Sequence, residues 1–339
     1  MENYLNNIEA RLSRLWPIQE QPDVWFSRQS GSTLTAGTVL ATTPVRQLIE
    51  RGGKRWRPLI MCLTSKALGA GDDDALFFTP LVELLHNASL VVDDIEDAAE
   101  LRRGQPAIHK IYGLDNSINS ANLAYFAPTI LIDELAQSNP NLALTIYKRY
   151  SLAMRCVHLG QALDINWHNA HSYWPSRQEY EEMCLLKTGA LAGLAAEIGY
   201  LMAKDNLNEA INYGKIWAKI GLAFQIIDDV KNITEEGIEG KEFGDDIVEG
   251  KKSLPVILYA TDTKEREQLA RLFVQAKSSN RAESILAIKE ASALLSGAAH
   301  QAKEYGLQLL NEGIEALRLL PNHEARHSLI AILKKWANL

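Results

Sequence analysis

Apolar residues recur along the chain at the three- and four-residue spacing of amphipathic helices, and no convincing alternating strand interrupts them. This pattern predicts successive helices over residues 46–49, 58–68, 80–99, 116–137, 142–167, 176–203, 206–232, 254–260 and most of 263–339. The breaks fall on turn-forming residues at positions 69–71, 104–106, 139–140 and 320–322. Ser176, followed three residues later by Glu179, predicts a capping box at one helix start.

No linker, low-complexity tract or internal repeat divides the chain. We therefore expect an all-α, single-domain helical bundle over residues 1–339, with a motif-bearing core over about residues 45–260 and a carboxy-terminal helical portion over residues 261–339. Hydrophobic residues make up 47% of the sequence, which is enough to build a sizeable core.

The net charge, the cysteine spacing and the hydropathy of the chain limit its possible partners and its cellular compartment. The net charge of −7 disfavours a nucleic-acid partner. The three scattered cysteines, without a CxxC pair, indicate thiols in a reducing cytoplasm. The amino terminus has no apolar leader, and the longest weakly charged stretch, 190–203, is too short to span a bilayer. The sequence predicts a cytoplasmic protein without an integral membrane segment.

An acidic cluster, DDIED (93–97), follows the apolar run ASLVV. Asp93 and Asp97 share one face of a helix, and Asp94 lies beside them. Carboxylates that crowd together in this way repel one another, but they suit Mg²⁺, which takes a few carboxylates together with phosphate oxygens and waters. An isolated DDxxD is equally compatible with a solvated helix end.

A second cluster, DDVKN (228–232), repeats the arrangement after another apolar run. Asp228 and Asp229 match the first pair, whereas Asn232 replaces a carboxylate with a poorer Mg²⁺ ligand. Two such clusters at the ends of apolar helices could face each other across a cavity and hold metal ions that bridge a diphosphate.

Cationic residues flank both clusters. Lys54 and Arg57 follow a glycine pair and precede a helix, and Arg102 and Arg103 come shortly after the first cluster. Further candidates are His86 two helical turns before Asp93, and Lys241, Lys251 and Lys252 after the second cluster. Together these residues predict a site for polyanionic substrates.

The sequence resembles the trans-isoprenyl diphosphate synthases, also called the polyprenyl synthetase family. The motifs that carry the resemblance span roughly residues 50 to 256 and are GGKRWRP (52–58), HNASLVVDDIED (86–97), LRRGQPAIHKIYG (101–113), GQALDINW (160–167), KTG (187–189), FQIIDDVKN (224–232) and EGKKSLP (249–255). Within the family it looks most like geranylgeranyl diphosphate synthases of fungi and animals, in which an asparagine also closes the second motif.

The resemblance implies the isoprenoid synthase fold around a central apolar cavity, a homodimer, and three Mg²⁺ ions per active site. It also implies a role for each matching residue. The isopentenyl diphosphate site would comprise Lys54, Arg57, His86 and Arg103. The metal ligands would be Asp93, Asp94, Asp97, Asp228 and Asp229. The allylic diphosphate site would comprise Arg102, Lys187, Thr188, Gln225, Asn232, Lys241 and Lys251, among which Lys187, Thr188 and Gln225 would be catalytic.

The implied reaction joins isopentenyl diphosphate to an allylic diphosphate. Ionisation of the allylic C–O bond would be aided by Mg²⁺ and cationic side chains, so no covalent nucleophile is needed and His109, His158 and His168 are expected to be structural. In this family a bulky aromatic residue just before the first motif closes the pocket at C15. Ala88 and Ser89 are small, and Leu81 and Leu85 are candidate floor residues, so C20 is the expected product.

Three alternatives remain at this point. The product could be C15, or C25 and longer. A terpene cyclase on the same scaffold would need the aspartates but not a second diphosphate site. A non-catalytic partner subunit would have no reason to keep both aspartate motifs and Lys187-Thr188-Gly189.

Overall fold

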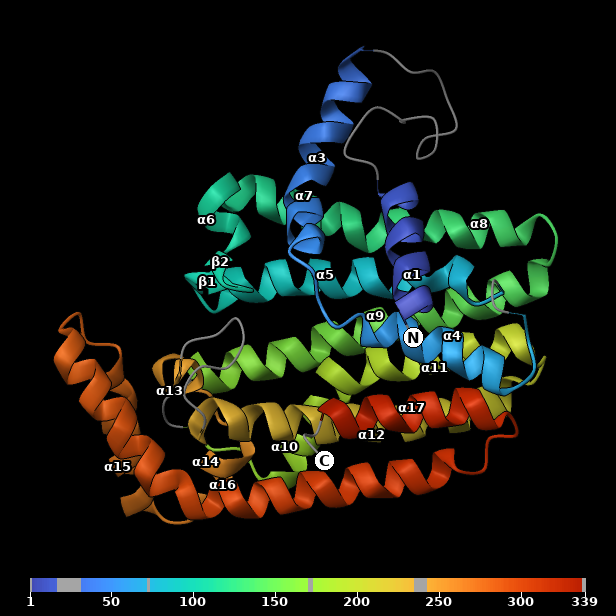
Figure 1. The fold of residues 1–339 in the computed structure, drawn as a ribbon. Coiled ribbons are helices and arrows are strands. Elements are labelled where there is room, and N and C mark those ends of the chain that lie inside the picture. The colour runs from blue at the N-terminus through green and yellow to red at the C-terminus, as the bar shows by residue number, and fades with distance from the viewer. Residues whose placement is uncertain (1, 17–31, 72–73, 170–172, 235–242, 337–339) are drawn as a thin grey trace. The chain divides into compact units, whose positions relative to one another are not determined.

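The computed structural model of the protein describes residues 2–16, 32–71, 74–169, 173–234 and 243–336, and within them almost every regular element is a helix (Figure 1). The exception is a short antiparallel pair of two-residue strands, β1 (Leu101–Arg102) and β2 (Gln105–Pro106). The prediction of an all-α protein is confirmed.

The chain divides into two compact units. The first comprises Met1–Leu152, Gly193–Gly214 and Leu320–Ile330, and the second comprises Ala153–Ala192, Lys215–Leu319 and Ala331–Leu339. Four helices contribute residues to both units, namely α9 (Pro140–Asn169), α11 (Ala190–Ala203), α12 (Leu207–Thr234) and α17 (His323–Trp336).

The first unit is built around α5. Its elements are α1 (Glu2–Leu15), α3 (Ser32–Glu50), α4 (Trp56–Ala67), η1 (Leu76–Phe78), α5 (Thr79–Glu96), β1, β2, α6 (Ile108–Tyr112), α7 (Leu114–Phe126), η2 (Ala127–Thr129) and α8 (Ile130–Ala136). Helix α5 packs against α1, α3, α4 and α7, and it runs beside α7 in Figure 1. This surrounding explains why α5 is apolar on most sides, with Leu81, Leu84, Leu85 and Ala88 fully buried.

Small residues on α7 allow its neighbours to approach closely. Ser117, Ser120, Ala121 and Ala124 are buried on this helix. The Val45 backbone N–H of α3 donates to the Ser120 hydroxyl at 3.2 Å, next to a proline that cannot donate a backbone hydrogen bond. The side-chain contact therefore ties α3 to α7.

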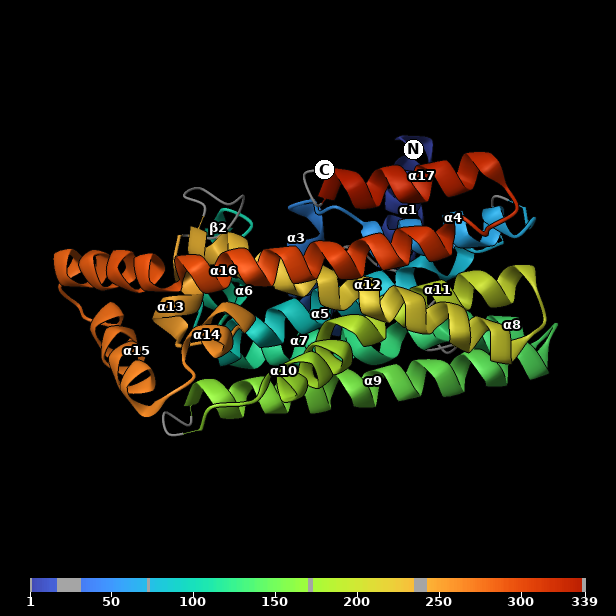
Figure 2. The same ribbon diagram turned by 90° about the horizontal axis from the view of Figure 1, so that it is seen from below.

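The second unit contains the long helix α16 (Arg281–Leu317), against which α14 (Leu254–Tyr259) and α15 (Thr263–Ala276) pack (Figure 2). Its other elements are α10 (Arg177–Cys184), a π turn (Leu185–Gly189) and α13 (Asp245–Glu249). Ile233, Ile247, Leu269 and Leu295 form part of its hydrophobic core.

Three local features differ from the predicted helices. The helix expected over 116–137 is divided into α7, η2 and α8, with Pro128 in the second position of η2. The helix expected over 176–203 is interrupted by the π turn, although the capping box at Ser176 is confirmed. Helix α1 was not predicted, because its polar surface hides an apolar stripe of Ile8, Leu12 and Leu15.

Two helical stretches are long and apolar enough to cross a membrane by length and composition, Leu76–Glu96 and Arg177–Ala203. Their most apolar windows are 61% and 67% buried inside the protein. Core helices of globular proteins show the same combination of apolar composition and burial, so these stretches give only weak evidence for a membrane span.

Candidate active site

The first acidic cluster lies where α5 ends. Asp93 is in the last turn, and Asp97 is the C-cap residue. The carboxyl end of a helix carries partial negative charge, so carboxylates there are doubly unfavourable without a cation. Arg102 supplies part of that charge, because its Nε donates to Asp94 Oδ1 at 2.6 Å and its Nη2 lies 3.4 Å from Asp93 Oδ2.

The three predicted metal ligands of this cluster are not equivalent. Asp94 is fully buried, and its pKa is raised by burial against the opposing effect of Arg102. Asp93 and Asp97 are only half-buried. Asp94 therefore anchors Arg102, whereas Asp93 and Asp97 keep partial access to solvent.

The glycine-rich loop before α4 adopts unusual backbone geometry. Gly52 has φ of 84° and Arg55 has φ of 46°, both in the left-handed region. The buried guanidinium of Arg55 donates to Glu83 at 2.9 Å and to Glu9 at 2.6 Å. These ion pairs fix the loop to α5 and α1. Arg55 was missed at the sequence level, because nothing in the motif separates this structural cation from its neighbours.

Arg57 is buried and carries an unsatisfied donor. Its guanidinium stacks on the Trp56 ring at 4.2 Å, and its Nε has no hydrogen-bond partner among the described residues. Burial lowers the pKa of Arg57 to about 10. A buried cation with an open donor is costly unless an anion completes the site. Lys54, in the same loop, is exposed.

His86 of α5 lies among arginines. The pKa of its imidazole is held well below the ordinary value, first by burial and then by Arg57, Arg103, Arg102 and Arg55. The structure therefore brings together Arg57, His86 and Arg103, three of the four residues predicted for the isopentenyl diphosphate site. A neutral imidazole beside several guanidinium groups is well suited to bind a diphosphate.

Arg103 is positioned by the β-turn between β1 and β2. It has φ of 55°, and its Nη1 donates to the Leu48 carbonyl at 2.7 Å and also to the Gly52 carbonyl. These bonds bind the hairpin to the glycine-rich loop. The sequence predicted only a break between helices here, not a hairpin. The hairpin nevertheless positions both Arg102 and Arg103.

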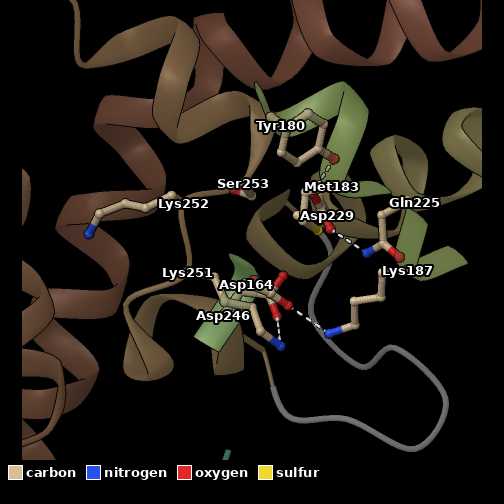
Figure 3. A pocket seen from close by; sticks show the side chains of 10 residues that line it. All are labelled: Asp164, Tyr180, Met183, Lys187, Gln225, Asp229, Asp246, Lys251, Lys252 and Ser253. Carbon is tan, nitrogen blue, oxygen red and sulfur yellow. Dashed lines mark hydrogen bonds and ion pairs between the residues drawn. The ribbon is translucent and has the colours of Figure 1, made fainter. Parts of the chain in front are cut away.

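The second acidic cluster belongs to a pocket of the second unit, shown in Figure 3. The pocket is lined by Asp164, Tyr180, Met183, Lys187, Gln225, Asp229, Asp246, Lys251, Lys252 and Ser253. It contains Lys187, Gln225, Asp229 and Lys251, four of the residues that the sequence predicts. Lysines and aspartates of the lining are paired, because Lys187 Nζ lies 2.6 Å from Asp164 and Lys251 Nζ lies 3.6 Å from Asp246.

A chain of hydrogen-bonded side chains connects two of the three predicted catalytic residues, Thr188 and Gln225, to Asp229 and Tyr180. The Thr188 hydroxyl donates to Gln225 Oε1 at 2.8 Å, Gln225 Nε2 donates to Asp229 Oδ1 at 2.8 Å, and the Tyr180 hydroxyl donates to Asp229 Oδ2 at 2.6 Å. Asp228 is exposed, whereas Asp229 is buried. Burial, followed by repulsion from Asp246, raises the pKa of Asp229 to about 7.

Lys187 and Thr188 lie in the π turn, a wider turn that often marks functional positions in helices. A glycine on α9 and the glycine that ends the turn allow its close packing. A Cβ on Gly160 of α9 would lie 2.5 Å from the Lys187 backbone nitrogen, and one on Gly189 would lie 2.9 Å from the Ala218 carbonyl oxygen. Asp164, one turn beyond Gly160, was not predicted as a site residue, although its motif, GQALDINW (160–167), was identified.

The remaining predicted residues take part in packing or hydrogen bonds within the fold, or lie outside the described residues. Asn232 is buried, and its Oδ1 accepts a hydrogen bond from the Asp246 backbone N–H at 3.0 Å, which fixes the start of α13. Leu81, Leu85 and Ala88 share one face of α5. The half-buried Ser89 donates its hydroxyl to the His86 carbonyl at 2.8 Å. Lys241 lies outside the described residues.

The carboxylates fit Mg²⁺ only as ligands shared with a substrate. Within the described ranges, no group of three or more His, Cys, Asp or Glu side chains could hold a metal ion by itself. Mg²⁺ typically uses one or two protein carboxylates and completes its shell with phosphate oxygens and waters. Asp93 and Asp97 provide such a partial set.

An arginine-rich anion site beside a cluster of carboxylates, on a helical scaffold, is typical of enzymes that act on phosphorylated substrates with a divalent metal. A family model described as polyprenyl synthetase matches residues 39–291, so the chain belongs to this family and is a prenyltransferase. The predicted family is confirmed.

Curated relatives and solved structures agree. The chain is 34% identical over 238 residues to a geranylgeranyl pyrophosphate synthase of Eremothecium gossypii, a match that covers 70% of this chain and 72% of that protein. It is 33% identical over 233 residues to one of Dictyostelium discoideum, covering 68% and 73%. The crystal structure of a geranylgeranyl pyrophosphate synthetase from Pyrococcus horikoshii superimposes with a TM-score of 0.84, at 28% identity, over 99% of this chain and 96% of that chain.

Proposed function

We propose that this prenyltransferase elongates allylic diphosphates with isopentenyl diphosphate, in the presence of Mg²⁺, to a C20 end product, geranylgeranyl diphosphate. The observation that carries the proposal is the arginine-rich site of Arg57, His86 and Arg103. A terpene cyclase ionises one diphosphate and has no use for a second diphosphate site, so this cluster supports elongation.

In the proposed reaction, Lys54, Arg57, His86 and Arg103 bind the diphosphate of isopentenyl diphosphate. Asp93, Asp97 and Asp228 hold Mg²⁺, which when bound stabilises the charge that builds on the leaving diphosphate. Arg102, Lys187 and Lys251 contribute fixed positive charge to the same leaving group, and Lys241 is proposed to do so on sequence grounds alone.

Thr188 and Gln225 act on the other product of ionisation. Their oxygens are electron-rich, and we propose that they stabilise the allylic cation while the isopentenyl double bond attacks it. The proton that is then lost passes to the released pyrophosphate. Apolar walls exclude the water that would otherwise quench the cation.

The C20 product rests on two supports. Ala88 and Ser89 leave no aromatic barrier directly before the first acidic cluster, and the relatives described above are geranylgeranyl pyrophosphate synthases. In this proposal, the tail passes Ala88 and ends near Leu85 or Leu81. One helical turn of about 5.4 Å is comparable with one extended isoprene unit.

We further propose a cytoplasmic homodimer. The exposed side chains of Leu40, Leu114, Ile118 and Phe126 give α3 and α7 apolar surface, with 70% of Phe126 exposed. Apolar surface of this kind often marks a protein interface. Cys62, Cys156 and Cys184 form no disulfide within the described part of the chain, which suits a reducing compartment. Light scattering of the purified protein would give the mass of a dimer, and a monomer at micromolar concentration would overturn this part.

The reaction is tested by product analysis. Purified protein is incubated with Mg²⁺, isopentenyl diphosphate and each of dimethylallyl, geranyl, farnesyl and geranylgeranyl diphosphate, and the products are identified by mass. The first three primers should all give a C20 diphosphate. Consumption of an allylic diphosphate alone, with release of a hydrocarbon, would favour a cyclase.

The second diphosphate site is tested separately with Lys54→Ala, because Lys54 is exposed and its replacement should not disturb folding. The KM for isopentenyl diphosphate should rise about 10-fold, as expected for loss of one charge-assisted contact, with the KM for the allylic substrate unchanged. Lys110→Ala, another exposed lysine, is the matched control. An equal change in both KM values would contradict the assignment.

A further inference from the structure

The hydrogen-bond chain Tyr180–Asp229–Gln225–Thr188 joins three elements of the second unit. Tyr180 belongs to α10, Thr188 to the π turn, and Gln225 and Asp229 lie one turn apart on α12. Tyr180 is only 1% exposed and Asp229 only 6%. Figure 3 shows the Tyr180 hydroxyl and the Gln225 amide both directed at the Asp229 carboxylate.

The groups on either side of Gln225, Asp229 and Thr188, determine the orientation of its side-chain amide. An amide presents a carbonyl on one side and an NH₂ group on the other, and the two orientations have nearly the same shape. The NH₂ group of Gln225 donates to Asp229 Oδ1 at 2.8 Å, so this side of the amide faces Asp229. The carbonyl oxygen is therefore left for Thr188, whose hydroxyl proton points to Gln225.

Tyr180 holds the other side of the Asp229 carboxyl group. Its O–H donates to Oδ2, the carboxylate oxygen that does not contact Gln225. The Cys184 thiol also lies within reach of the Tyr180 hydroxyl, but a thiol is a weaker acceptor than a carboxylate. With one donor on each oxygen, the buried Asp229 carboxyl group is held in a single orientation.

We infer that Tyr180 and Asp229 are positioning residues that orient the oxygens of Gln225 and Thr188. This inference rests on the proposed function, since oriented oxygens matter only if an allylic cation forms beside them. Asp228, the exposed neighbour on α12, is the carboxylate of this cluster to which the proposed function assigns Mg²⁺.

Asp228→Asn and Asp229→Asn form a matched pair, because each removes one negative charge from adjacent positions. In Asp229→Asn, one of the two acceptor oxygens becomes an NH₂ group. If this group faces Gln225, the Gln225 amide must turn its own NH₂ group towards Thr188, and if it faces Tyr180, the tyrosine hydroxyl loses its carboxylate acceptor. We expect kcat to fall about 100-fold with the Mg²⁺ half-saturation concentration within about twofold of the wild type. Asp228→Asn should instead raise that concentration about 10-fold or more. Equal shifts in Mg²⁺ dependence would overturn the inference.

A double-mutant cycle tests whether Tyr180 acts through Thr188. Tyr180→Phe should lower kcat about 10-fold, and Thr188→Val should lower it to a similar extent. In the Thr188→Val background, Tyr180→Phe should have almost no further effect on kcat, because the residue through which it acts is gone. Multiplicative losses would refute the connection.

Two controls separate this inference from unfolding and from failure of the proposed function. Tyr150→Phe also removes a buried tyrosine hydroxyl, one that donates to the Tyr125 carbonyl, and should lower Tm without lowering kcat. Wild-type protein that forms no product with isopentenyl diphosphate would contradict the proposed function. Wild-type turnover combined with an unaffected kcat in both Tyr180→Phe and Asp229→Asn would contradict the positioning role alone.

Discussion

Gly160→Ala should displace the π turn that carries Lys187 and Thr188. The added Cβ would lie 2.5 Å from the Lys187 backbone nitrogen and 2.9 Å from its Cα and Cβ. Favourable contacts between such atoms lie at about 3.5–4.0 Å, so α9 and the turn must separate by about 1 Å. Neither partner can avoid the clash by changing a rotamer, because the contact is mainly with backbone.

The expected magnitudes follow from this displacement. Alanine in a helix interior is favoured over glycine by about 1 kcal/mol, whereas overpacking costs about 1–3 kcal/mol, so stability should fall by about 0–2 kcal/mol. A misplacement of about 1 Å in a catalytic group costs about 100-fold in rate. Activity should therefore suffer far more than stability.

The assay is steady-state kinetics with isopentenyl and farnesyl diphosphate, paired with thermal unfolding. Gly297→Ala is the matched control, because Gly297 lies inside α16 and an added Cβ would meet nothing within 4 Å. That variant should keep wild-type kcat and gain up to about 1 kcal/mol in stability. A Gly160→Ala enzyme with wild-type kcat would show that the position of the π turn does not limit the reaction.

Three further predictions concern other parts of the molecule. Ala88→Phe should shorten the main product from C20 to C15, because the fully buried Ala88 lies on the face of α5 proposed to line the tail; mass analysis showing unchanged chain length would refute this placement. Glu83→Ala should destabilise the protein by about 3 kcal/mol, measured by denaturant unfolding, because it deprives the buried Arg55 of its buried partner; a loss below about 1 kcal/mol would mean that Glu9 suffices. Lys252→Met should change the pH dependence of stability, because burial lowers the pKa of Lys252 from 10.5 to about 8. Between these two pH values the unfolded wild-type chain binds more protons than the folded one. The stability of the wild type should therefore rise with pH relative to that of the variant. A constant difference in Tm from pH 7 to 10.5 would instead show that the Trp174 and Phe273 rings, 4.4 and 4.9 Å from Nζ, keep the lysine charged.

Helical periodicity and motif spacing could predict much of this protein from its sequence. The all-α fold follows from periodicity, because a buried helix face must repeat every three to four residues. The grouping of Arg57, His86 and Arg103 could also be anticipated, because each of these basic residues belongs to a motif that carries the family resemblance. The capping box at Ser176 could be predicted directly, because it depends only on two residues three positions apart in the sequence.

Features set by backbone geometry could not be predicted in this way. Arg55 has the same residue type as Arg57, and only its left-handed φ and its ion pair with Glu83 show that it serves the fold. Asp94 and Asp229 look like their neighbours Asp93 and Asp228, and burial alone separates them. Identical residue types thus differ in role through solvent access, which a linear pattern does not record.

The π turn also has a consequence for the lineage of this segment. A π turn corresponds to one residue inserted into an α-helix, which survives when the widened backbone serves a function. Helices α10 and α11 flank such an insertion, so a helical wheel drawn through residues 177–203 changes its buried side at Leu185–Gly189 by about 100°. Related sequences that lack the extra residue would carry the same apolar pattern one position out of step beyond this point. A deletion here would rotate the whole of α11, whereas the same deletion in a surface loop would be absorbed locally.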